Sequence, residues 1–354
     1  MMIVMRADAT QDQVQNVLRI IDEHGLQAHF SQGAERAVIG VVGDIRVLSP
    51  EMLRRQPSVA RVVSISKPFK LSSREFHPRD TVFPVGNVPI GGRGLVLIAG
   101  PCSVEDRTQL FETAQAVREA GAHILRGGAY KPRTSPYSFQ GMGEQGLELL
   151  AEAGEATGMP VVTEVLEAGM VSLVARYAQM LQVGARNMQN YALLHAVGAK
   201  MHPVLLKRGM SASVKELLMA AEYILSHDNN QVVVCERGIR TFETATRNTT
   251  DINALPVLKR ETHLPVFLDP SHSTGHWEYV AAIARAAAAA GAQGLMIEVH
   301  VNPEQALSDG GQSLKPERFA RLVGEVGSIC EALGWSLAAT SRAPASDSSS
   351  EVSA

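Results

Sequence analysis

Eight short apolar runs between residues 95 and 299 each end at a charged or metal-capable side chain. Each run is followed by a stretch with the length and composition of a helix, so the repeating unit is one strand and one helix. Eight such units in about 200 residues predict an α/β fold, a closed (β/α)8 TIM barrel of parallel strands. The runs occupy residues 95–99, 123–125, 160–163, 180–183, 203–206, 231–234, 265–268 and 294–297. Catalysis in such a barrel takes place at the carboxyl ends of the strands, where these charges lie.

The amino-terminal residues 1–66 follow a different pattern. Strands are predicted at 3–5, 27–30, 37–42 and 59–65, and helices at 10–23 and 50–55, with Gly25 and Gly43 as breaks. This βαββαβ order predicts a ferredoxin-like domain. Residues 67–93 are rich in proline and glycine and are expected to form a linker, with a short hairpin that caps the closed end of the barrel. The barrel is expected over 94–338, and the Ala-, Ser- and Pro-rich residues 339–354 are expected to be a disordered tail.

The composition excludes several classes of protein. Lys and Arg number 33 against 36 Asp and Glu, so the chain has no general attraction for nucleic acid or an anionic membrane. Three cysteines without paired spacing argue for a reducing compartment. No apolar run approaches the roughly 18 residues of a membrane span, and no signal peptide is evident. We therefore expect a cytoplasmic location.

Four residues at or after three strand ends suggest one site for a divalent cation. A thiol, an imidazole and two carboxylates suit a first-row ion such as Mn, Fe, Co or Zn better than Mg. The first, seventh and eighth strands are neighbours in a closed barrel, so residues distant in sequence meet there. The four proposed ligands are Cys102, His272, Glu298 and Asp309. Singly, each has a simpler interpretation as a core thiol, a loop histidine or a turn aspartate, and His300 is a competing ligand.

Cations from four other strand ends form a second group. They are Arg126, Lys131, Arg133, Arg186, Lys207, Arg208, Arg237 and Arg240. So many positive charges at one rim would repel one another without a ligand, which indicates a substrate set with several negative charges. Two phosphates and a carboxylate fit this description. The alternative is a solvated rim, in which these cations pair with Glu164, Glu236 and Asp269.

The loop at 126–136 concentrates this chemistry, because it combines Gly127 and Gly128 with cations and hydroxyls. At this point the chain resembles a known family. The segments LRGGAYKPRTSPYSFQG (125–141), GPCSVE (100–105), VGARNMQN (183–190), LKRGM (206–210), CERGIRTFE (235–243), DPSHSTG (269–275), IEVH (297–300) and LSDGGQSL (307–314) together resemble 3-deoxy-D-arabino-heptulosonate 7-phosphate (DAHP) synthase. The resemblance covers the barrel and is greatest to the short microbial type, which has an amino-terminal ferredoxin-like regulatory domain.

The resemblance implies an aldol-type condensation of phosphoenolpyruvate with erythrose 4-phosphate and water. This reaction begins the shikimate pathway of aromatic amino-acid biosynthesis and releases phosphate. Cys102, His272, Glu298 and Asp309 would hold the metal, with manganese among the candidates. Phosphoenolpyruvate would be bound by Arg126, Lys131, Arg186, Lys207 and Arg237, and the aldose phosphate by Arg133, Thr134 and Ser135. Catalysis would involve Cys102, His272 and Lys131, with Lys131 as general acid to the new hydroxyl and Glu164 or a metal-bound water as alternative proton carriers.

Other functions stay open at this stage. 3-Deoxy-manno-octulosonate 8-phosphate synthase has a similar barrel and uses arabinose 5-phosphate. Its loop usually reads Lys-Ala-Asn-Arg-Ser, whereas this chain has Lys131-Pro-Arg-Thr-Ser, which favours the four-carbon sugar. A metal-dependent aldolase and a non-catalytic amino-acid-sensing paralogue are weaker alternatives. After DPSHSTG the family would have basic residues, but this chain has His276-Trp277-Glu278.

The resemblance also implies feedback inhibition by tyrosine or phenylalanine at the amino-terminal domain. His29 and Ser31 lie two residues apart on a predicted strand, face the same way and are the proposed allosteric contacts. The alternative is that this domain serves only packing or oligomerisation. A homotetramer is expected from the family alone.

Overall fold

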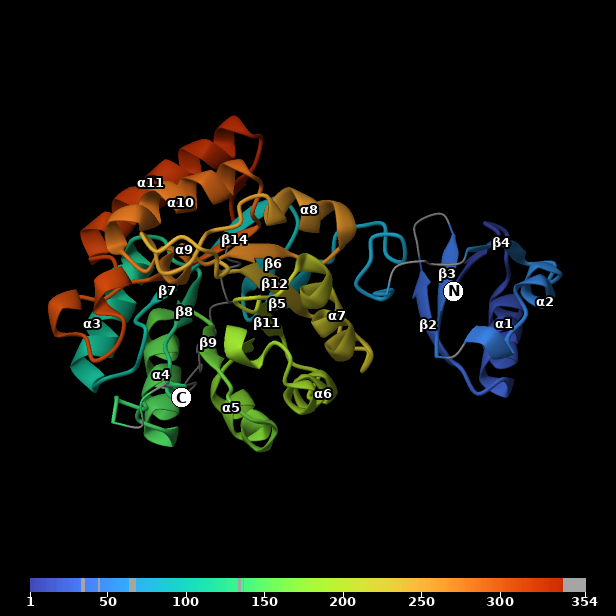
Figure 1. Cartoon of the computed structure of the whole chain (residues 1–354), viewed down its shortest axis with the longest axis horizontal. Coiled ribbons are helices and arrows are strands. Elements are labelled where there is room, and N and C mark those ends of the chain that lie inside the picture. Colours follow the sequence, from blue (N-terminus) through green and yellow to red (C-terminus); the bar gives the residue numbers. More distant parts are fainter. Residues whose placement is uncertain (33–35, 44, 64–67, 133–134, 136, 340–354) are drawn as a thin grey trace, which may run out of the picture.

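The computed structural model of the chain describes residues 1–32, 36–43, 45–63, 68–132, 135 and 137–339. A barrel and a smaller amino-terminal sheet lie at opposite ends of the molecule's long axis (Figure 1). The two parts were predicted from the change in sequence pattern near residue 66, and each contains its own cluster of buried apolar side chains.

The barrel consists of eight parallel strands in sequence order. Each strand pairs with the next one, and β14 pairs with β7, which closes the sheet. The strands are β7 (Gly94–Gly100), β8 (Ile124–Arg126), β9 (Val161–Glu164), β10 (Met180–Val183), β11 (Val204–Lys207), β12 (Val232–Glu236), β13 (Val266–Leu268) and β14 (Gly294–Glu298). All eight predicted runs are therefore strands, and the predicted TIM barrel is confirmed.

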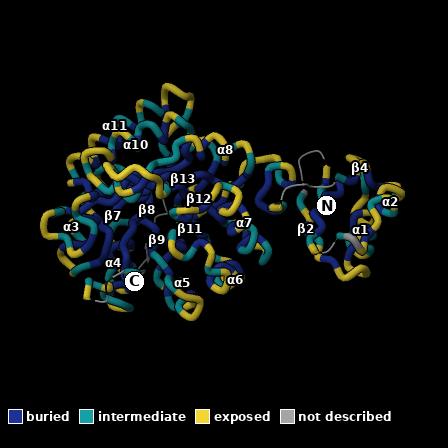
Figure 2. Tube along the Cα trace, in the orientation of Figure 1, coloured by how far each residue is buried: buried dark blue, intermediate teal, exposed yellow. Residues whose placement is uncertain are grey.

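Helices surround the strands, which are buried while the outer helix faces are exposed (Figure 2). They are α3 (Arg107–Glu119), α4 (Glu144–Thr157), α5 (Val171–Tyr177), α6 (Tyr191–Ala199), α7 (Val214–Leu225), α8 (Ala254–Glu261), α9 (Pro270–Thr274), α10 (Trp277–Ala289) and α11 (Pro316–Ala332). Single 3-10 turns are η1 (Ile45–Val47), η2 (Ala168–Met170), η3 (Ala185–Asn187), η4 (Pro303–Gln305) and η5 (Gly310–Gln312). A short strand, β15 (Ser336–Leu337), adds to the start of β7.

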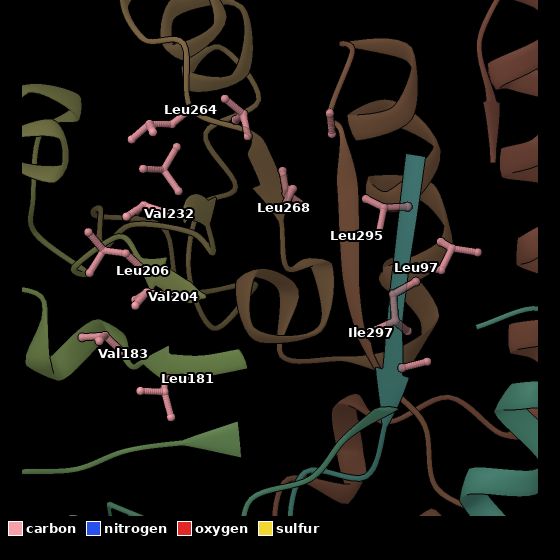
Figure 3. Close-up of a cluster of buried hydrophobic side chains, with 14 of the residues drawn as sticks. Leu97, Leu181, Val183, Val204, Leu206, Val232, Leu264, Leu268, Leu295 and Ile297 are labelled. Carbon is pink, nitrogen blue, oxygen red and sulfur yellow. The ribbon is translucent and has the colours of Figure 1, made fainter. Parts of the chain in front are cut away.

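Successive side chains of each strand belong to two different apolar layers. Leu95 and Leu97 of β7 pack in the layer between strands and helices, part of which is drawn in Figure 3. Val96 and Ile98 pack in the barrel interior. This alternation explains the continuous apolar runs in the sequence, because both faces of a barrel strand are buried. The predicted hairpin is also present, and its two strands, β5 (Phe83–Val85) and β6 (Val88–Ile90), add their apolar side chains to the interior layer.

The amino-terminal part has the predicted ferredoxin-like order. Its elements are β1 (Met2–Met5), α1 (Gln11–Glu23), β2 (Gln27–Gln32), β3 (Ala37–Val42), α2 (Pro50–Arg54) and β4 (Val59–Val63). The antiparallel sheet has the strand order β2-β3-β1-β4. Thr10 begins α1 with a reciprocal capping box to Gln13. The predicted fourth strand ran to residue 65, but residues 64–67 and the tail from 340 on lie outside the described residues.

Hydrogen bonds that are partly or fully buried hold the segment after the amino-terminal sheet against the barrel wall. The Glu222 carboxylate on α7 accepts hydrogen bonds from the backbone N–H groups of Lys70, Leu71 and Ser72 at 2.6–3.0 Å. His263 lies between this segment and β13, with Nε2 2.7 Å from the Leu71 carbonyl oxygen and Nδ1 2.6 Å from the Thr81 hydroxyl. Burial lowers the pKa of His263 to about 4. The imidazole is therefore neutral in the folded protein.

His263 should make the folded protein sensitive to mild acid. Its pKa is about 4 in the fold and about 6.5 as a free side chain, so protons bind preferentially to the unfolded chain between these values. Its contribution to stability is present above pH 6.5 and should fall by about 3 kcal/mol as the pH decreases toward 4. Urea unfolding from pH 7.5 to pH 4 should show a smaller loss of stability in His263→Gln than in the wild type. Parallel pH dependences for the two proteins would contradict this assignment.

Among the described residues, no helix combines the length and apolar character that crossing a membrane requires.

Candidate active site at the carboxyl ends of the barrel strands

The charged side chains singled out in the sequence converge at one end of the barrel. Arg126, Glu164, Lys207 and Glu298 are the last residues of β8, β9, β11 and β14. Parallel strands end at the same rim, so each strand delivers its terminal side chain to the same region. Cys102 follows β7, and the long connection after β14 returns Asp309 to this rim.

Three of the four proposed metal ligands form one compact group. One ligand atom from each of Cys102, Glu298 and Asp309 lies within 4.8 Å of the others. The Cys102 thiol donates to Asp309 Oδ2 over 3.4 Å. The fourth, His272, adjoins the group beside Glu298, with Nε2 3.4 Å from Glu298 Oε1. The competing candidate His300 lies outside this group, and its Nε2 is 3.4 Å from Glu105 Oε2.

The electrostatics of this group fit a cation. Burial and then the Glu298 charge raise the pKa of the Cys102 thiol to about 12. Burial alone would raise the pKa of Glu298, but the charges of His272, Arg126 and Lys131 lower it to about 2. A thiol, an imidazole and two carboxylates are a donor set that a first-row divalent ion accepts. The residues present therefore fit such an ion, which would favour the thiolate form of Cys102.

His272 is oriented by an aspartate. Asp269 precedes the short helix α9, and its Oδ1 accepts from the His272 backbone N–H over 2.9 Å. The other carboxylate oxygen, Oδ2, lies 2.7 Å from His272 Nδ1 and is also bound by the Lys207 ammonium at 2.5 Å. Burial would raise the pKa of Asp269, but His272 and Lys207 hold it well below its usual value. The carboxylate thus keeps the hydrogen on Nδ1, which leaves Nε2 free to act as a ligand.

Lys131 lies between the Cys102 group and the cavity. Its Nζ donates to the Cys102 carbonyl oxygen and to Cys102 Sγ, both at 2.9 Å. Burial would lower its pKa, but Cys102 and the carboxylates of Glu298 and Glu164 together raise the pKa above the usual lysine value. Gly128 leaves the space for this contact, since a Cβ there would lie 2.8 Å from both the Cys102 oxygen and Lys131 Cδ. The two glycines were expected to admit a ligand, but Gly127 and Gly128 face neighbouring protein atoms.

A cavity of about 250 Å³ opens beside these groups. Five cations and two carboxylates are among its walls, so an anionic ligand is favoured. The lining residues are Lys131, Pro132, Ser138, Glu164, Gln182, Gly184, Ala185, Arg186, Lys207, Arg237, Arg247, His272 and Asp309.

Arg237 has a buried donor atom that suits an anionic ligand. Its Nη1 is buried and lacks a hydrogen-bond partner among the residues that the structure describes. Burial and the charges of Arg247 and Arg186 lower the pKa of Arg237, although the Asp269 carboxylate acts to raise it. A buried donor without a partner costs about 1–3 kcal/mol, which an anionic oxygen from a ligand would offset.

Several predicted contacts lie elsewhere. Arg126 is buried behind the cavity, where Nη1 donates to Glu298 Oε1 at 2.7 Å. Arg208 is buried in a pair with Glu236 and Asp251, so for this residue the paired alternative describes the structure. Ser135 Oγ accepts from the Tyr137 N–H, and Ser138 lines the cavity in its place. Arg133 and Thr134 lie outside the described residues, while Arg240 lines a smaller neighbouring cavity with Arg186.

Gln182 and Arg247 belong to the cavity wall but were not singled out from the sequence. Gln182 points inward from β10 and donates to Glu164 Oε2 at 3.3 Å. Arg247 comes from the long connection between β12 and α8. Gln182 lies within its strand and Arg247 far from any strand end, so the search of strand ends missed both. For Gln182, a polar residue inside an apolar run was the available signal.

His29 and Ser31 lie on β2, where the amino-terminal sheet faces the barrel. His29 is buried, and Nδ1 is 2.9 Å from Oδ1 of Asp228 on the loop after α7. Both residues line a cavity of about 580 Å³ between the two parts, together with Phe76 and His263. Nε2 of His29 is buried without a partner among the described residues.

Comparisons with known proteins agree with the fold. Residues 72–332 match the DAHP synthetase I family, and residues 1–67 match the DAHP synthase ferredoxin-like domain. A phospho-2-dehydro-3-deoxyheptonate aldolase of Thermotoga maritima is 50% identical over 334 residues, which cover 94% of this chain and 99% of that protein. A 2-dehydro-3-deoxyphosphooctonate aldolase of Nitrobacter hamburgensis is 34% identical over 261 residues, covering 68% of this chain and 90% of that protein.

Solved structures give the same result. The crystal structure of the Thermotoga maritima DAHP synthase matches with a TM-score of 0.76 and 49% identity, covering 95% of this chain and 98% of that one. A truncated form of the enzyme from the same organism has a TM-score of 0.71 and 51% identity, over 75% of this chain and 98% of that one. With both of its parts matched and half of its residues shared with a near full-length relative, this chain is an enzyme of the DAHP synthase family.

Proposed function

We propose that this enzyme condenses phosphoenolpyruvate with erythrose 4-phosphate and water, giving DAHP and inorganic phosphate. This reaction is the first step of the shikimate pathway. The observation that carries the proposal is the buried Nη1 of Arg237, which has no hydrogen-bond partner among the described residues. Its cavity also has Lys131, Arg186 and Lys207 in its walls. A ligand with several negative charges offsets both the unmet donor and the repulsion among the cations. The family of this chain supports the choice of substrates.

Cys102, His272, Glu298 and Asp309 are the residues that would hold a divalent cation. Their donor atoms suit Mn, Fe, Co or Zn, and the group lies next to the cationic cavity. A cation bound there would supply Lewis-acid polarisation to the aldehyde of the sugar phosphate.

The protein side chains have separate roles in the proposed reaction. Arg186, Lys207 and Arg237 bind the phosphate of phosphoenolpyruvate and stabilise it as it leaves. Carbon 3 of phosphoenolpyruvate bonds to the aldehyde carbon, and the aldehyde oxygen takes a proton from Lys131. Water adds at carbon 2, and one of its protons restores the Lys131 ammonium. The bond from carbon 2 to the phosphate oxygen then breaks, the other proton leaves with the phosphate, and a ketone and inorganic phosphate result. Lys131 is protonated at neutral pH and therefore has a proton to donate, and its ammonium lines the cavity beside the proposed cation site.

Arg126 supports this site in a different way from the sequence-based expectation. Its guanidinium is held by Glu298 and reaches the Cys102 carbonyl oxygen at 3.4 Å. We propose that Arg126 keeps its contact with Glu298 when it binds the carboxylate of phosphoenolpyruvate. The predicted contacts of the aldose phosphate, Arg133, Thr134 and Ser135, belong to the loop that begins at Lys131.

Phosphate release tests the reaction and its cation together. Activity should require both phosphoenolpyruvate and erythrose 4-phosphate, disappear after thorough chelation and return when Mn, Co or Zn is added. Arabinose 5-phosphate in place of erythrose 4-phosphate should give little product. Preferential use of arabinose 5-phosphate would favour the octulosonate reaction, which the relative of Nitrobacter hamburgensis is named for. No turnover with either sugar would favour the non-catalytic sensing role.

We further propose that tyrosine or phenylalanine inhibits the enzyme by binding near His29 and Ser31. The cavity there touches both the amino-terminal sheet and the barrel, and Nε2 of His29 is buried with no partner in the described part of the chain, so it can bind a polar ligand group. An effector that binds two parts of a chain together is able to favour one arrangement of them. Calorimetry with each amino acid on the wild type and His29→Ala tests this proposal. A homotetramer is proposed on the family resemblance, and sedimentation analysis measures it directly.

A further inference from the structure

A buried glutamine links the two carboxylates of the proposed cation site. Gln312 is 2% exposed and lies in the turn η5, three residues after Asp309. Its Nε2 donates to Glu298 Oε2 over 2.7 Å, and its backbone N–H donates to the Asp309 carbonyl oxygen at 3.1 Å. Oε1 of Glu298 is already engaged by Arg126. The Glu298 carboxylate is therefore fixed at both oxygens.

Arg247, from the connection between β12 and α8, completes this link. Its Nη1 donates to Gln312 Oε1 over 2.8 Å and lies 3.5 Å from Asp309 Oδ2. Asp309 has a positive φ of 49°, a backbone conformation that is uncommon for a residue with a side chain. The contacts to Arg247 and within η5 hold it in that conformation. Nη1 of Arg247 thus lies directly beside the Asp309 carboxylate. It is linked to the Glu298 carboxylate through the side-chain amide of Gln312.

The segment that carries Arg247 is also fastened to the helix of His272. The backbone N–H groups of Arg247 and Asn248 donate to the carbonyl oxygens of Thr274 and Ser273 at 3.0 Å. The Asn248 side chain donates to the His272 carbonyl oxygen at 2.9 Å. A Cβ at Gly275, where φ is +71°, would lie only 2.3 Å from Arg247 Cβ. Because Gly275 has no Cβ, the aliphatic part of the Arg247 side chain can pack directly against the end of α9.

We propose that Arg247 and Gln312 are positioning residues that hold Glu298, Asp309 and the helix of His272 in one arrangement and so set the affinity of the cation site. This inference rests on the proposed cation site at Cys102, His272, Glu298 and Asp309. Side chains that orient metal ligands typically change metal affinity by 10- to 100-fold when they are replaced. Without Gln312, Oε2 of Glu298 loses its hydrogen-bond donor. Without Arg247, Asp309 loses its cationic neighbour.

Cobalt(II) titration of the full-length, metal-depleted protein without substrate tests the pair. Cobalt bound to a cysteine thiolate absorbs in the near ultraviolet, so the absorbance reports occupancy independently of turnover. Gln312→Leu and Arg247→Met should each weaken cobalt binding by about 10- to 100-fold. Arg247→Lys keeps the positive charge but not the planar fork and should fall between Arg247→Met and the wild type. Matched controls on the outer helices are Gln115→Leu on α3 and Arg260→Met on α8, and both should bind cobalt as the wild type does.

The outcomes separate this inference from the cation site on which it depends. Wild-type affinity in folded Gln312→Leu and Arg247→Met would overturn the positioning role and leave the cation site intact. The same result would assign Arg247 to the substrate cavity alone. No thiolate absorption in the wild type, or unchanged absorption in Cys102→Ala, would overturn the cation site itself. If Gln312→Leu does not fold, the half-exposed Arg247 still decides the question through its methionine and lysine variants.

Discussion

Replacing Cys102 by alanine is expected to remove cation binding and to lower turnover by about 10³-fold. The thiol is one of three donors within 4.8 Å of one another, and the imidazole and two carboxylates that remain are a weaker set for a borderline ion. A loss of about 4 kcal/mol of transition-state stabilisation corresponds to three factors of ten in rate. Phosphate release at saturating substrates and metal content after dialysis measure the two effects.

Cys330→Ala is the matched control for this substitution. Cys330 and Cys102 are both 2% exposed, but Cys330 lies in α11 and contributes no atom to the metal group. It should keep wild-type activity and metal content, which would separate the loss of a ligand from the cost of a buried cavity. Activity that survives both Cys102→Ala and thorough chelation would contradict the cation site.

Cation binding at Cys102 should also release a proton. The pKa of about 12 means that the thiol is protonated at neutral pH before an ion binds, whereas the ligand form is the thiolate. Calorimetric titration with Zn in buffers of different ionisation enthalpy counts the released protons. Cys102→Ala should release no proton when Zn is added, because it lacks both the thiol and the cation binding that depends on the thiol.

The barrel was predictable because its determinants are local. Each strand had to be apolar on both faces, and each was followed by a helical stretch, so eight short runs specified eight strands. The ends of those strands then gave Arg126, Glu164, Lys207 and Glu298 without any knowledge of tertiary contacts. The glycine breaks likewise separated the predicted helices and strands of the amino-terminal part.

The pairing of these groups was not predictable, because it depends on distances that spacing does not encode. Arg126 and Glu298 are 172 residues apart and form a buried pair. Arg208 follows Lys207 directly in the chain, yet only Lys207 lines the cavity. Adjacent residues of an extended chain point in opposite directions, so a cationic pair at a strand end is divided between the cavity and the barrel wall. Arg247 and Gln312 lie on irregular connections, for which no periodicity exists.

Lys131 is the residue for which geometry and charge favour proton donation most directly. Its ammonium contacts Cys102 Sγ and lines the cavity, so it lies between the proposed cation site and the proposed substrates. Its raised pKa keeps the proton available throughout the neutral range. The other cavity cations are less suited to this role. Lys207 is bound to Asp269 on the far side of His272, and the arginines do not release protons at neutral pH.

Lys131→Met should lower kcat by about 10²- to 10⁴-fold, the range that positioned general acids contribute. Lys131→Arg keeps the charge that attracts phosphoenolpyruvate but not a transferable proton, so it should have a KM near that of the wild type and a kcat as low as that of the methionine variant. Lys200→Met, on the exposed end of α6, controls for the loss of a lysine charge and should change neither constant. A Lys131→Met enzyme with unchanged kcat and raised KM would make Lys131 a binding cation, and the proton would then have to come from another group. The split between kcat and KM therefore decides between the two roles, because only a proton donor acts after both substrates are bound.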